Sequence, residues 1–295
     1  MSGTVSLALT AASMLAAASL TPQQQAALVV VSGLPAPPGV GGVLVQGWSR
    51  TLPRPTGALV YVDQEGGEVR AFKTDPPNSP ASSYRSSTAA LAAGRAAGRS
   101  LKARGVHVDL APVVDLPDGP LGGRHFRRPE FAVSFARGLA AARVGACAKH
   151  FPGLGSTPIS TDDRPHVDGT IRAAEIAAFR SAIRAGVPCV MTSNAFYDGA
   201  PYRASISPDT YRRLRALGFD GVAITDSLSI VKAAPVERWA PQAMLAGADL
   251  LLFTSPAHAR RAIAALLPLA REGKLDVSVE RVLRFRSRLL RARRP

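Results

Sequence analysis

Lys102-Ala103-Arg104-Gly105, followed at once by Val106-His107-Val108-Asp109-Leu110, is the stretch that decides the fold of this 295-residue chain. A helical segment ends at a glycine, and a short apolar run typical of a buried strand begins directly after it. Glycine just past a helix adopts the left-handed conformation at little cost, which suits a turn from helix to strand. The stretch therefore predicts a helix that leads into one strand of a covered, parallel sheet.

The same pattern, a glycine at the end of a helical segment followed by an apolar run, recurs four more times along the chain. It places Gly145 before 146–150, Gly186 before 187–191, Gly218 before 221–225 and Gly247 before 249–253. Three earlier apolar runs, Ala27–Val31, Gly42–Gln46 and Ala58–Asp63, bring the number of expected strands to eight. Helices are expected over 88–104, 129–143, 172–185, 208–217, 237–246, 257–271 and 278–292.

Eight strands that alternate with helices, without a dividing linker, predict an α/β fold: one (β/α)8 TIM barrel domain over 21–295. The connection over 35–41 is rich in Pro and Gly and too short for a full helix. The alternative is an open doubly wound sheet, which favours a glycine-rich phosphate loop after its first strand. Gly33-Leu34-Pro35 does not supply such a loop.

Residues 1–20 have two interpretations that remain open. Ser6–Leu20 is apolar and rich in Ala and Ser, like the core of a signal peptide, but it lacks a basic segment before it. The other interpretation is an alanine-rich first helix. The first predicts a secreted or cell-wall-associated protein and the second a cytoplasmic one. No other run is long and apolar enough to predict a membrane span.

The formal net charge is +15, with 31 Arg against 5 Lys, and seven of the arginines lie in the last fifteen residues. Elsewhere the arginines are scattered and not interleaved with aromatic residues. A clustered basic face is the signature of nucleic-acid binding, so no nucleic-acid partner is expected. Cys147 and Cys189 lie in apolar runs and are interpreted as reduced core residues without a metal or redox role.

Polar side chains follow the predicted strands where each one ends. Asp63 ends the third strand, Lys149-His150 the fifth, Thr192-Ser193-Asn194 the sixth and Thr225-Asp226 the seventh, while Arg124 follows the fourth. Active sites of such barrels lie at the C-terminal ends of the strands. Carboxylates, cations, hydroxyls and amides around one mouth suit a polyol, which offers many hydrogen-bonding groups. The pattern predicts a sugar site.

The chain resembles the catalytic barrel of glycoside hydrolase family 3, especially its single-domain β-N-acetylhexosaminidase branch. Six pieces carry the resemblance in the family's order over roughly residues 25–290: Asp63-Gln64-Glu65-Gly66-Gly67, Ala111-Pro112-Val113-Val114-Asp115, Gly123-Arg124-His125-Phe126, Lys149-His150-Phe151-Pro152-Gly153-Leu154-Gly155, Met191-Thr192-Ser193 and Gly221-Val222-Ala223-Ile224-Thr225-Asp226-Ser227-Leu228.

The resemblance implies roles for individual residues. Asp226 matches the nucleophile that forms a covalent glycosyl-enzyme in a retaining mechanism. Substrate-binding roles are implied for Asp63, Arg124, Lys149 and His150, and are expected of Asn194, which stands where the family often has histidine. Each residue also has a structural alternative, such as a helix cap for Asp226 or an ion pair for Lys149.

The general acid/base is where the chain departs from the branch it resembles. The branch has a Gly-His-Gly turn and then an Asp-Ser-His triplet that supplies the acid/base. Here Leu154 replaces the turn histidine, and Arg164 stands where the triplet's histidine belongs. Arginine stays protonated and cannot serve as acid/base. His166, two residues on, and Asp162 are the candidates for the acid/base loop.

These observations predict a retaining exo-acting β-glycosidase, acting on β-N-acetylglucosaminides from cell-wall or chitin fragments through Asp226. The alternatives are a catalytically impaired carbohydrate-binding barrel, a β-glucosidase-type specificity, or an aldolase with Lys149 as Schiff-base lysine. The predicted partner is a small carbohydrate and the predicted state is a monomer. No cofactor and no metal are expected, because no His, Cys or carboxylate cluster has ligand spacing.

Overall fold

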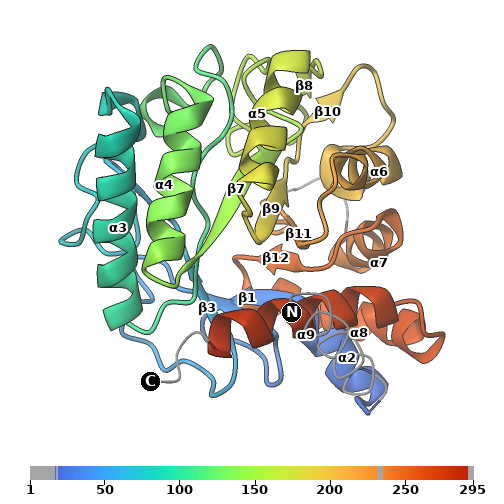
Figure 1. Cartoon of the computed structure of the whole chain (residues 1–295). Coiled ribbons are helices and arrows are strands. Elements are labelled where there is room, and N and C mark those ends of the chain that lie inside the picture. The colour runs from blue at the N-terminus through green and yellow to red at the C-terminus, as the bar shows by residue number, and fades with distance from the viewer. Residues whose placement is uncertain (1–16, 18, 231–234, 292–295) are drawn as a thin grey trace, which may run out of the picture.

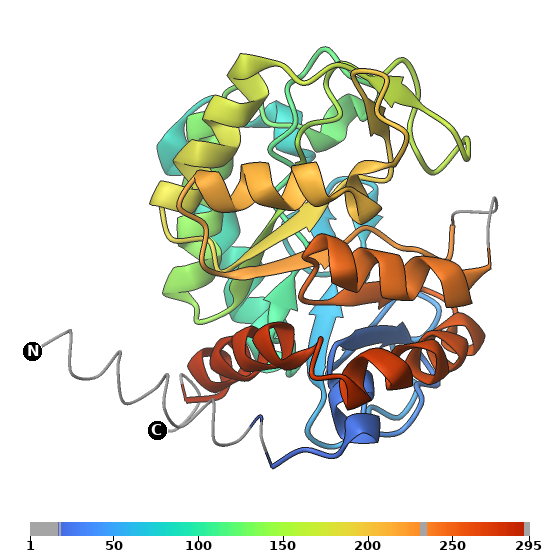
Figure 2. The same cartoon turned by 90° about the vertical axis from the view of Figure 1, so that its right-hand side faces the viewer.

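The computed structural model describes residues 17, 19–230 and 235–291. Both interpretations of residues 1–20 concern a segment that lies almost wholly outside the described residues. The described chain forms one parallel sheet with helices around it (Figures 1 and 2). The eight strands of that sheet are β1 (Val30–Gly33), β2 (Gly42–Leu44), β3 (Leu59–Val62), β6 (Val108–Asp109), β7 (Gly145–Phe151), β9 (Cys189–Thr192), β11 (Val222–Thr225) and β12 (Leu251–Phe253).

The strand order shows that the sheet is a barrel. Neighbours run β11-β9-β7-β6-β3-β2-β1-β12, so consecutive strands of the sheet are adjacent throughout. The two end strands also meet, because Ile224 bridges Leu250 in parallel and Thr225 N–H donates to the Leu250 carbonyl at 3.0 Å. The predicted (β/α)8 barrel is therefore confirmed, and the doubly wound alternative is excluded.

Helices ring the barrel from β3 onward, as Figure 1 shows. They are α3 (Ser87–Ala103), α4 (Pro129–Ala141), α5 (Ala173–Arg184), α6 (Pro208–Ala216), α7 (Val236–Ala246), α8 (Pro256–Arg271) and α9 (Asp276–Arg291). No helix connects β1 to β2 or β2 to β3 in these described segments. Small residues let α3 and α4 approach closely, since a Cβ on Gly94 would lie 2.2 Å from the Phe135 carbonyl oxygen.

The predicted helix-to-strand turns are present, and at one of them a residue other than glycine takes the left-handed conformation. A left-handed backbone (φ from 75° to 120°) is found at Gly105, Gly186, Gly218 and Gly247. At the turn before β7 the left-handed residue is Arg143, with φ 61°, and Gly145 begins the strand instead. The glycine pattern therefore predicts the turn correctly there, but not the residue that makes it.

The first strand is predicted at Ala27–Val31 but begins three residues later, at Val30, so the prediction of its start was wrong. Residues 22–28 form a short helix, α2 (Pro22–Leu28), which ends before the strand begins at Val30. Thr21 caps this helix, and Gln24 completes a capping box with it. Reading only the apolar run misses the capping residues, which fix where the helix begins.

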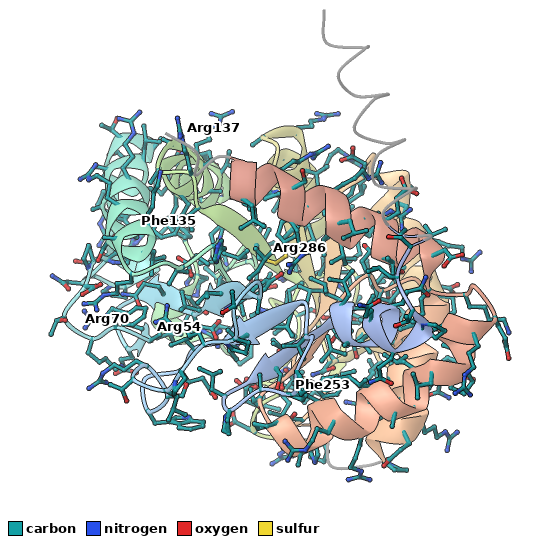
Figure 3. All side chains as sticks on the ribbon, turned by 90° about the horizontal axis from the view of Figure 1, so that it is seen from below. Arg54, Arg70, Phe135, Arg137, Phe253 and Arg286 are labelled. Carbon is teal, nitrogen blue, oxygen red and sulfur yellow. A yellow bond between two sulfur atoms is a disulfide. The ribbon has the colours of Figure 1, made fainter. Side chains whose placement is uncertain are left out.

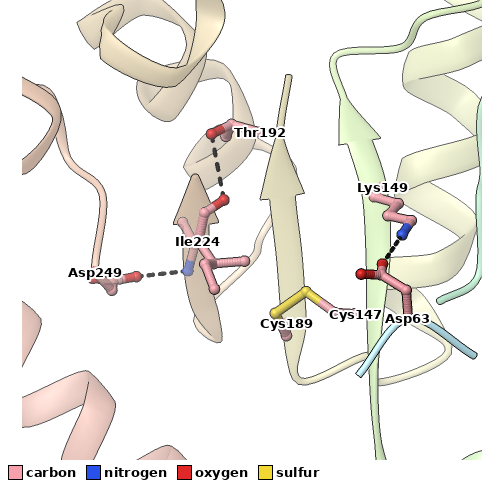
Figure 4. The surroundings of a disulfide bond; sticks show 8 residues. Asp63, Cys147, Lys149, Cys189, Thr192, Ile224 and Asp249 are labelled. Carbon is pink, nitrogen blue, oxygen red and sulfur yellow. Dashed lines mark hydrogen bonds and ion pairs between the residues drawn. A yellow bond between two sulfur atoms is a disulfide. The ribbon is translucent and has the colours of Figure 1, made fainter. Parts of the chain in front are cut away.

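The prediction that Cys147 and Cys189 are reduced was also wrong. They form a disulfide between β7 and β9, with Cα atoms 4.4 Å apart (Figure 4). Both are buried, as predicted, and they are register partners on the two adjacent strands. The pairing follows from strand register, which brings together residues 42 positions apart in the chain.

Helix α9 covers the N-terminal end of the barrel, where Arg286 is labelled in the view from below (Figure 3). Arg286 donates to the carbonyls of Gly41 and Gly57, just before β2 and β3. Leu289 lies against Gly145 at the start of β7. The C-terminal end of the barrel carries shorter elements: 3-10 helices η1 (Ala81–Ser83), η2 (Gly122–Arg124) and η3 (Ala204–Ile206), and strands β4 (Gln64–Gly66), β5 (Val69–Arg70), β8 (Asp168–Gly169) and β10 (Phe196–Tyr197).

Two structural features are absent from the described residues. Among them, no helix combines the length and apolarity needed to cross a bilayer. Within the same residues, no group of three or more His, Cys, Asp or Glu side chains is arranged to hold a metal ion.

Candidate active site

A cavity of about 310 Å³ opens at the C-terminal ends of the barrel strands. Six of the eight predicted site residues line it: Asp63, Arg124, Lys149, His150, Asp162 and Asp226. They come from segments between 63 and 226 and meet only because parallel strands end at the same edge. The other two predicted residues, His166 and Asn194, are not among its lining residues.

Lys149 is the most buried charge in this wall, with 2% of its side chain exposed. Its Nζ lies 2.6 Å from Asp63 Oδ1 and 2.6 Å from Glu65 Oε1. Burial lowers the pKa of Lys149, but these two carboxylates outweigh burial and hold it above its usual range. A Schiff-base lysine needs a neutral amine, so this geometry argues against the aldolase alternative.

Glu65 links Lys149 to Arg124. Arg124 donates from Nε and Nη2 to the two Glu65 oxygens, both at 2.9 Å, in the fork geometry that orients a guanidinium firmly. Burial raises the pKa of Glu65, but Lys149 and Arg124 outweigh it and bring the pKa to about 2. Glu65 thus stays ionised and fixes two cations at the cavity wall.

His150 is oriented by Asp115. Its Nδ1 lies 2.8 Å from Asp115 Oδ2, and its backbone N–H donates to the same carboxylate. Leu154 N–H donates to Asp115 as well, at 2.9 Å. Asp115 therefore holds the ring and the following turn together.

Lys149 and His150 both line the cavity although they are neighbours in β7. Successive side chains of a regular strand point to opposite faces. Here the register with β9 shifts between Ala148 and Phe151. This irregularity lets two adjacent polar residues face the same side.

Asp226 follows β11 directly and is fixed by its backbone. Its N–H donates to the Thr192 carbonyl at 2.8 Å, and its Oδ1 accepts from Ser227 N–H at 2.7 Å. Its Oδ2 makes no hydrogen bond to any other described residue. Burial raises the pKa of Asp226, the charge of His150 lowers it and that of Asp162 raises it. The carboxylate is thus anchored on one oxygen and leaves the other for a ligand.

Asn194 is buried and engaged by the protein. Its Nδ2 donates to the Ser227 carbonyl at 3.1 Å, and its Oδ1 accepts from Ser205 Oγ at 2.7 Å. It ties the segment after β9 to the segment that carries Asp226. Its contacts are those of a positioning residue.

His166 and Asp162 lie differently in the loop after β7. The side chain of His166 is 63% exposed, its Nε2 lies 3.2 Å from Asp168 Oδ1, and its ring stacks on Phe196 with centroids 4.1 Å apart. Asp162 is exposed too, but it lines the cavity with Ser160 and Thr161. Its charge acts on both Asp226 and Arg124.

Comparison with known proteins shows the family of this chain. The model of the glycosyl hydrolase family 3 N terminal domain matches residues 45–285. The chain belongs to glycosyl hydrolase family 3. A beta-hexosaminidase of Alkalilimnicola ehrlichii is 33% identical over 238 residues, which cover 71% of this chain and 68% of the relative.

Two solved structures extend the comparison. A family 3 beta-N-acetylglucosaminidase from Paenibacillus sp. superposes with TM-score 0.82 at 26% identity, covering 94% of this chain and 64% of that one. A beta-N-acetylhexosaminidase from Beutenbergia cavernae superposes with TM-score 0.73 at 27% identity, covering 93% and 99%. Family membership makes this chain a glycoside hydrolase for β-linked sugars, as the sequence predicted.

The turn after β7 in this family 3 barrel depends on a residue that sequence analysis missed. Glu175, buried in α5, accepts from Gly155 N–H at 2.6 Å and is paired with Arg172. A Cβ on Gly153 would lie 2.3 Å from the Glu175 carboxyl carbon, so this position has no room for a side chain. The sequence alone does not predict this role of Glu175, because its contact with Gly155 forms only once the chain is folded.

The cavity also has an apolar wall, which the polar residues at the strand ends did not predict. It is formed by Leu44, Val69, Leu110, Leu121, Leu154, Met191, Ile230 and Leu252. Leu154, the residue that departs from the hexosaminidase pattern, is itself in this wall and 1% exposed. The cavity therefore pairs a charged side with an apolar side, which suits a sugar ring that has both polar edges and C–H faces.

Proposed function

We propose that the chain is a retaining, exo-acting β-N-acetylhexosaminidase that cleaves β-N-acetylglucosaminides of cell-wall or chitin fragments. The observation that carries the proposal is the Asp226 carboxylate, anchored by one oxygen and facing the cavity whose wall holds Asp63, Arg124, Lys149 and His150. The names of the two hexosaminidase relatives and of the N-acetylglucosaminidase neighbour support the sugar.

In the first step Asp226 attacks the anomeric carbon, and the bond to the aglycone oxygen breaks. The sugar becomes an ester of Asp226, and the leaving oxygen takes a proton from the general acid. The charged wall holds the ring during attack, because charge-assisted hydrogen bonds to its hydroxyls fix its position. Water then attacks the anomeric carbon from the side the aglycone left, and the bond to Asp226 breaks to release its carboxylate. The water's proton goes to the same group, and the β configuration is restored.

Asp162 is our proposed acid/base. It lines the same cavity as Asp226, and a carboxyl group is one of the side chains that serve as general acid and base. His166 is the other candidate, but its ring is stacked on Phe196 and it does not line the cavity. Most retaining glycosidases use two carboxyl groups that flank the scissile bond, and we assign Asp162 to the second of these positions, beside Asp226.

The disulfide supports a secreted or cell-wall-associated enzyme over a cytoplasmic one. Disulfides persist in oxidising compartments and are rare in the cytosol. Mass analysis of the protein isolated from its source under non-reducing conditions, with free thiols blocked, tests this. Two blocked thiols per chain would favour the cytoplasm.

Covalent trapping tests the mechanism. Incubation with an activated fluorinated N-acetylglucosaminide, followed by peptide mapping, is expected to label Asp226 and no other residue. The Asp226→Asn variant is the matched control and is expected to stay unlabelled. Label on a different carboxylate would refute the assigned nucleophile, and turnover of a chromogenic β-glucoside but not of the N-acetyl analogue would favour the β-glucosidase specificity.

The second candidate is a carbohydrate-binding barrel with impaired turnover. Arg164 in place of the branch's histidine and Leu154 in the cavity wall favour it. Sugar binding by calorimetry, with no turnover of the chromogenic substrate between pH 4 and pH 9, would select this function over the enzyme.

A further inference from the structure

A second cavity, of about 230 Å³, lies on the other side of the turn that follows β7. Pro152 of that turn lines it, whereas His150 and Leu154 line the first cavity. The remaining wall comes from Ile171, from residues 197–204 and from the first turns of α6. Apart from Pro152, neither the proposed reaction nor the sequence motifs use these residues.

Polar groups with unused hydrogen-bonding capacity converge on this cavity. Ser207 precedes α6 without capping it through its side chain. In the described part of the chain, the hydroxyls of Ser207 and Thr210 and the guanidinium of Arg213 make no hydrogen bond or ion pair with other residues. Asp198 Oδ1 accepts a hydrogen bond from Ile171 N–H at 3.2 Å. The other oxygen stays unbonded within the same described residues.

Tyr202 supplies an exposed aromatic surface at the same place. It is 49% exposed and is one of five large hydrophobic side chains found exposed among the described residues. Tyr197, Ala200 and Ala204 continue the apolar side of the wall. An aromatic ring beside hydroxyl, carboxylate and guanidinium groups can pack on the C–H face of a pyranose while the polar groups bond its hydroxyls.

The charges favour a neutral ligand. Asp198 and Asp209 would repel an anion, Arg213 would repel a cation, and Asp209 is already paired with Arg212. Hydroxyls both donate and accept, so a neutral polyol is the chemical class that can satisfy all of these groups at once.

We propose that this second cavity is an accessory carbohydrate site that binds a neutral sugar unit of a longer glycan. It rests on the proposed function in one respect, that the natural substrate is a glycan. The site adds affinity for oligomers and polymers through a second point of attachment and takes no part in bond cleavage. Tyr202 and Arg213 are its principal contacts.

Kinetics with short and long substrates test this site. We expect Tyr202→Ala and Arg213→Ala each to raise KM for an N-acetylglucosamine tetramer about tenfold, as for loss of an anchor residue. Turnover of a chromogenic single-sugar N-acetylglucosaminide is expected to stay unchanged. Leu245→Ala and Arg260→Ala are the matched controls, because they remove an exposed apolar and an exposed charged side chain on α7 and α8.

Direct binding separates this proposal from the proposed function. In the Asp226→Asn variant, calorimetry is expected to show the tetramer binding about tenfold more tightly than in a variant that also carries Tyr202→Ala and Arg213→Ala, because one tetramer contacts both sites. Unchanged tetramer kinetics and binding in the double variant would overturn the accessory site. Absence of turnover on every substrate, with the gain in tetramer affinity from Tyr202 and Arg213 intact, would refute the enzyme and keep the site.

Discussion

The two ends of the barrel both bury charged side chains, but they use them differently. At the N-terminal end, Asp249 is fully buried and accepts from Arg215 at 2.6 Å, from Arg281 at 3.1 Å and from Ala223 N–H at 2.8 Å. At the C-terminal end, Lys149 is equally buried, yet its partner Asp63 has 36% of its side chain exposed and lines the cavity.

The difference lies in what each cluster leaves unsatisfied. Every oxygen of the Asp249 carboxylate has a partner from the protein, and α9 covers the end of the barrel where it lies. The cluster at the cavity is held from behind by Glu65 and keeps donors and acceptors directed at the opening. Buried ion pairs are thus stabilising elements at one end and a preorganised ligand surface at the other, as expected of a barrel whose site is at the C-terminal face.

The sharpest way to test this contrast is Asp226→Asn. At the cavity end we expect turnover to drop by about 10⁴-fold or more, because the nucleophile is lost. Folding stability is expected to stay within about 1 kcal/mol of the wild type, because burial already disfavours the charged form. Steady-state kinetics and urea unfolding measure the two. A large loss of stability would mean that this carboxylate is structural.

The converse test is Asp249→Asn at the covered end. Removing one charge leaves Arg215 and Arg281 without their partner, so we expect the free energy of unfolding to drop by about 3 kcal/mol. At 20 °C the folded fraction should retain wild-type kcat and KM, since Asp249 lies far along the strands from the cavity. If Asp249→Asn instead lowers kcat and leaves the free energy of unfolding unchanged, the charges at the covered end are not structural and the contrast between the two ends is wrong.

Proton delivery gives the next largest effect. Asp162→Asn is expected to lower kcat about 10²-fold for substrates with poor leaving groups, and much less for an activated aryl leaving group that needs no proton. His166→Ala is expected to leave kcat nearly unchanged. Asp163→Asn, a neighbouring exposed carboxylate, is the matched control. If His166→Ala gives the large, leaving-group-dependent loss, the histidine is the acid/base.

The smallest effect concerns Asp109, a carboxyl near the cavity that behaves like neither cluster. It is fully buried, its Oδ1 accepts from Gln64 N–H at 2.9 Å, and its Oδ2 has no partner among the described residues. Burial raises its pKa to about 8. The unfolded chain loses this proton near pH 4, so wild-type stability due to this group declines between pH 4 and pH 8.

Asp109→Asn keeps the acceptor and removes the titration. We therefore expect the variant to lose less stability than the wild type between pH 5 and pH 6.5, by about 2 kcal/mol. Urea unfolding at the two pH values measures the difference. Equal pH dependence of both proteins would show that Asp109 is ionised in the fold.

The sequence predicted the barrel because its signals are local. Glycine after a helix and an apolar run after the glycine are read within about ten residues, and the order of the runs gives the strands. The sequence likewise predicted that Asp63, Lys149 and Asp226 would lie around one cavity, because parallel strands place their C-terminal ends at the same edge. The wrong start predicted for β1 also has a local cause. Thr21 and Gln24 form a capping box, which begins a helix where the apolar run alone predicts a strand.

Contacts between residues distant in the sequence were decided by tertiary structure alone. Strand register paired Cys147 with Cys189, and the path of α9 gave Asp249 its partner Arg281. The second cavity arose where α6 packs beside the turn after β7. Composition and periodicity determine which residues face inward, but which buried residue meets which depends on distances across the fold, and these exist only once the barrel has closed.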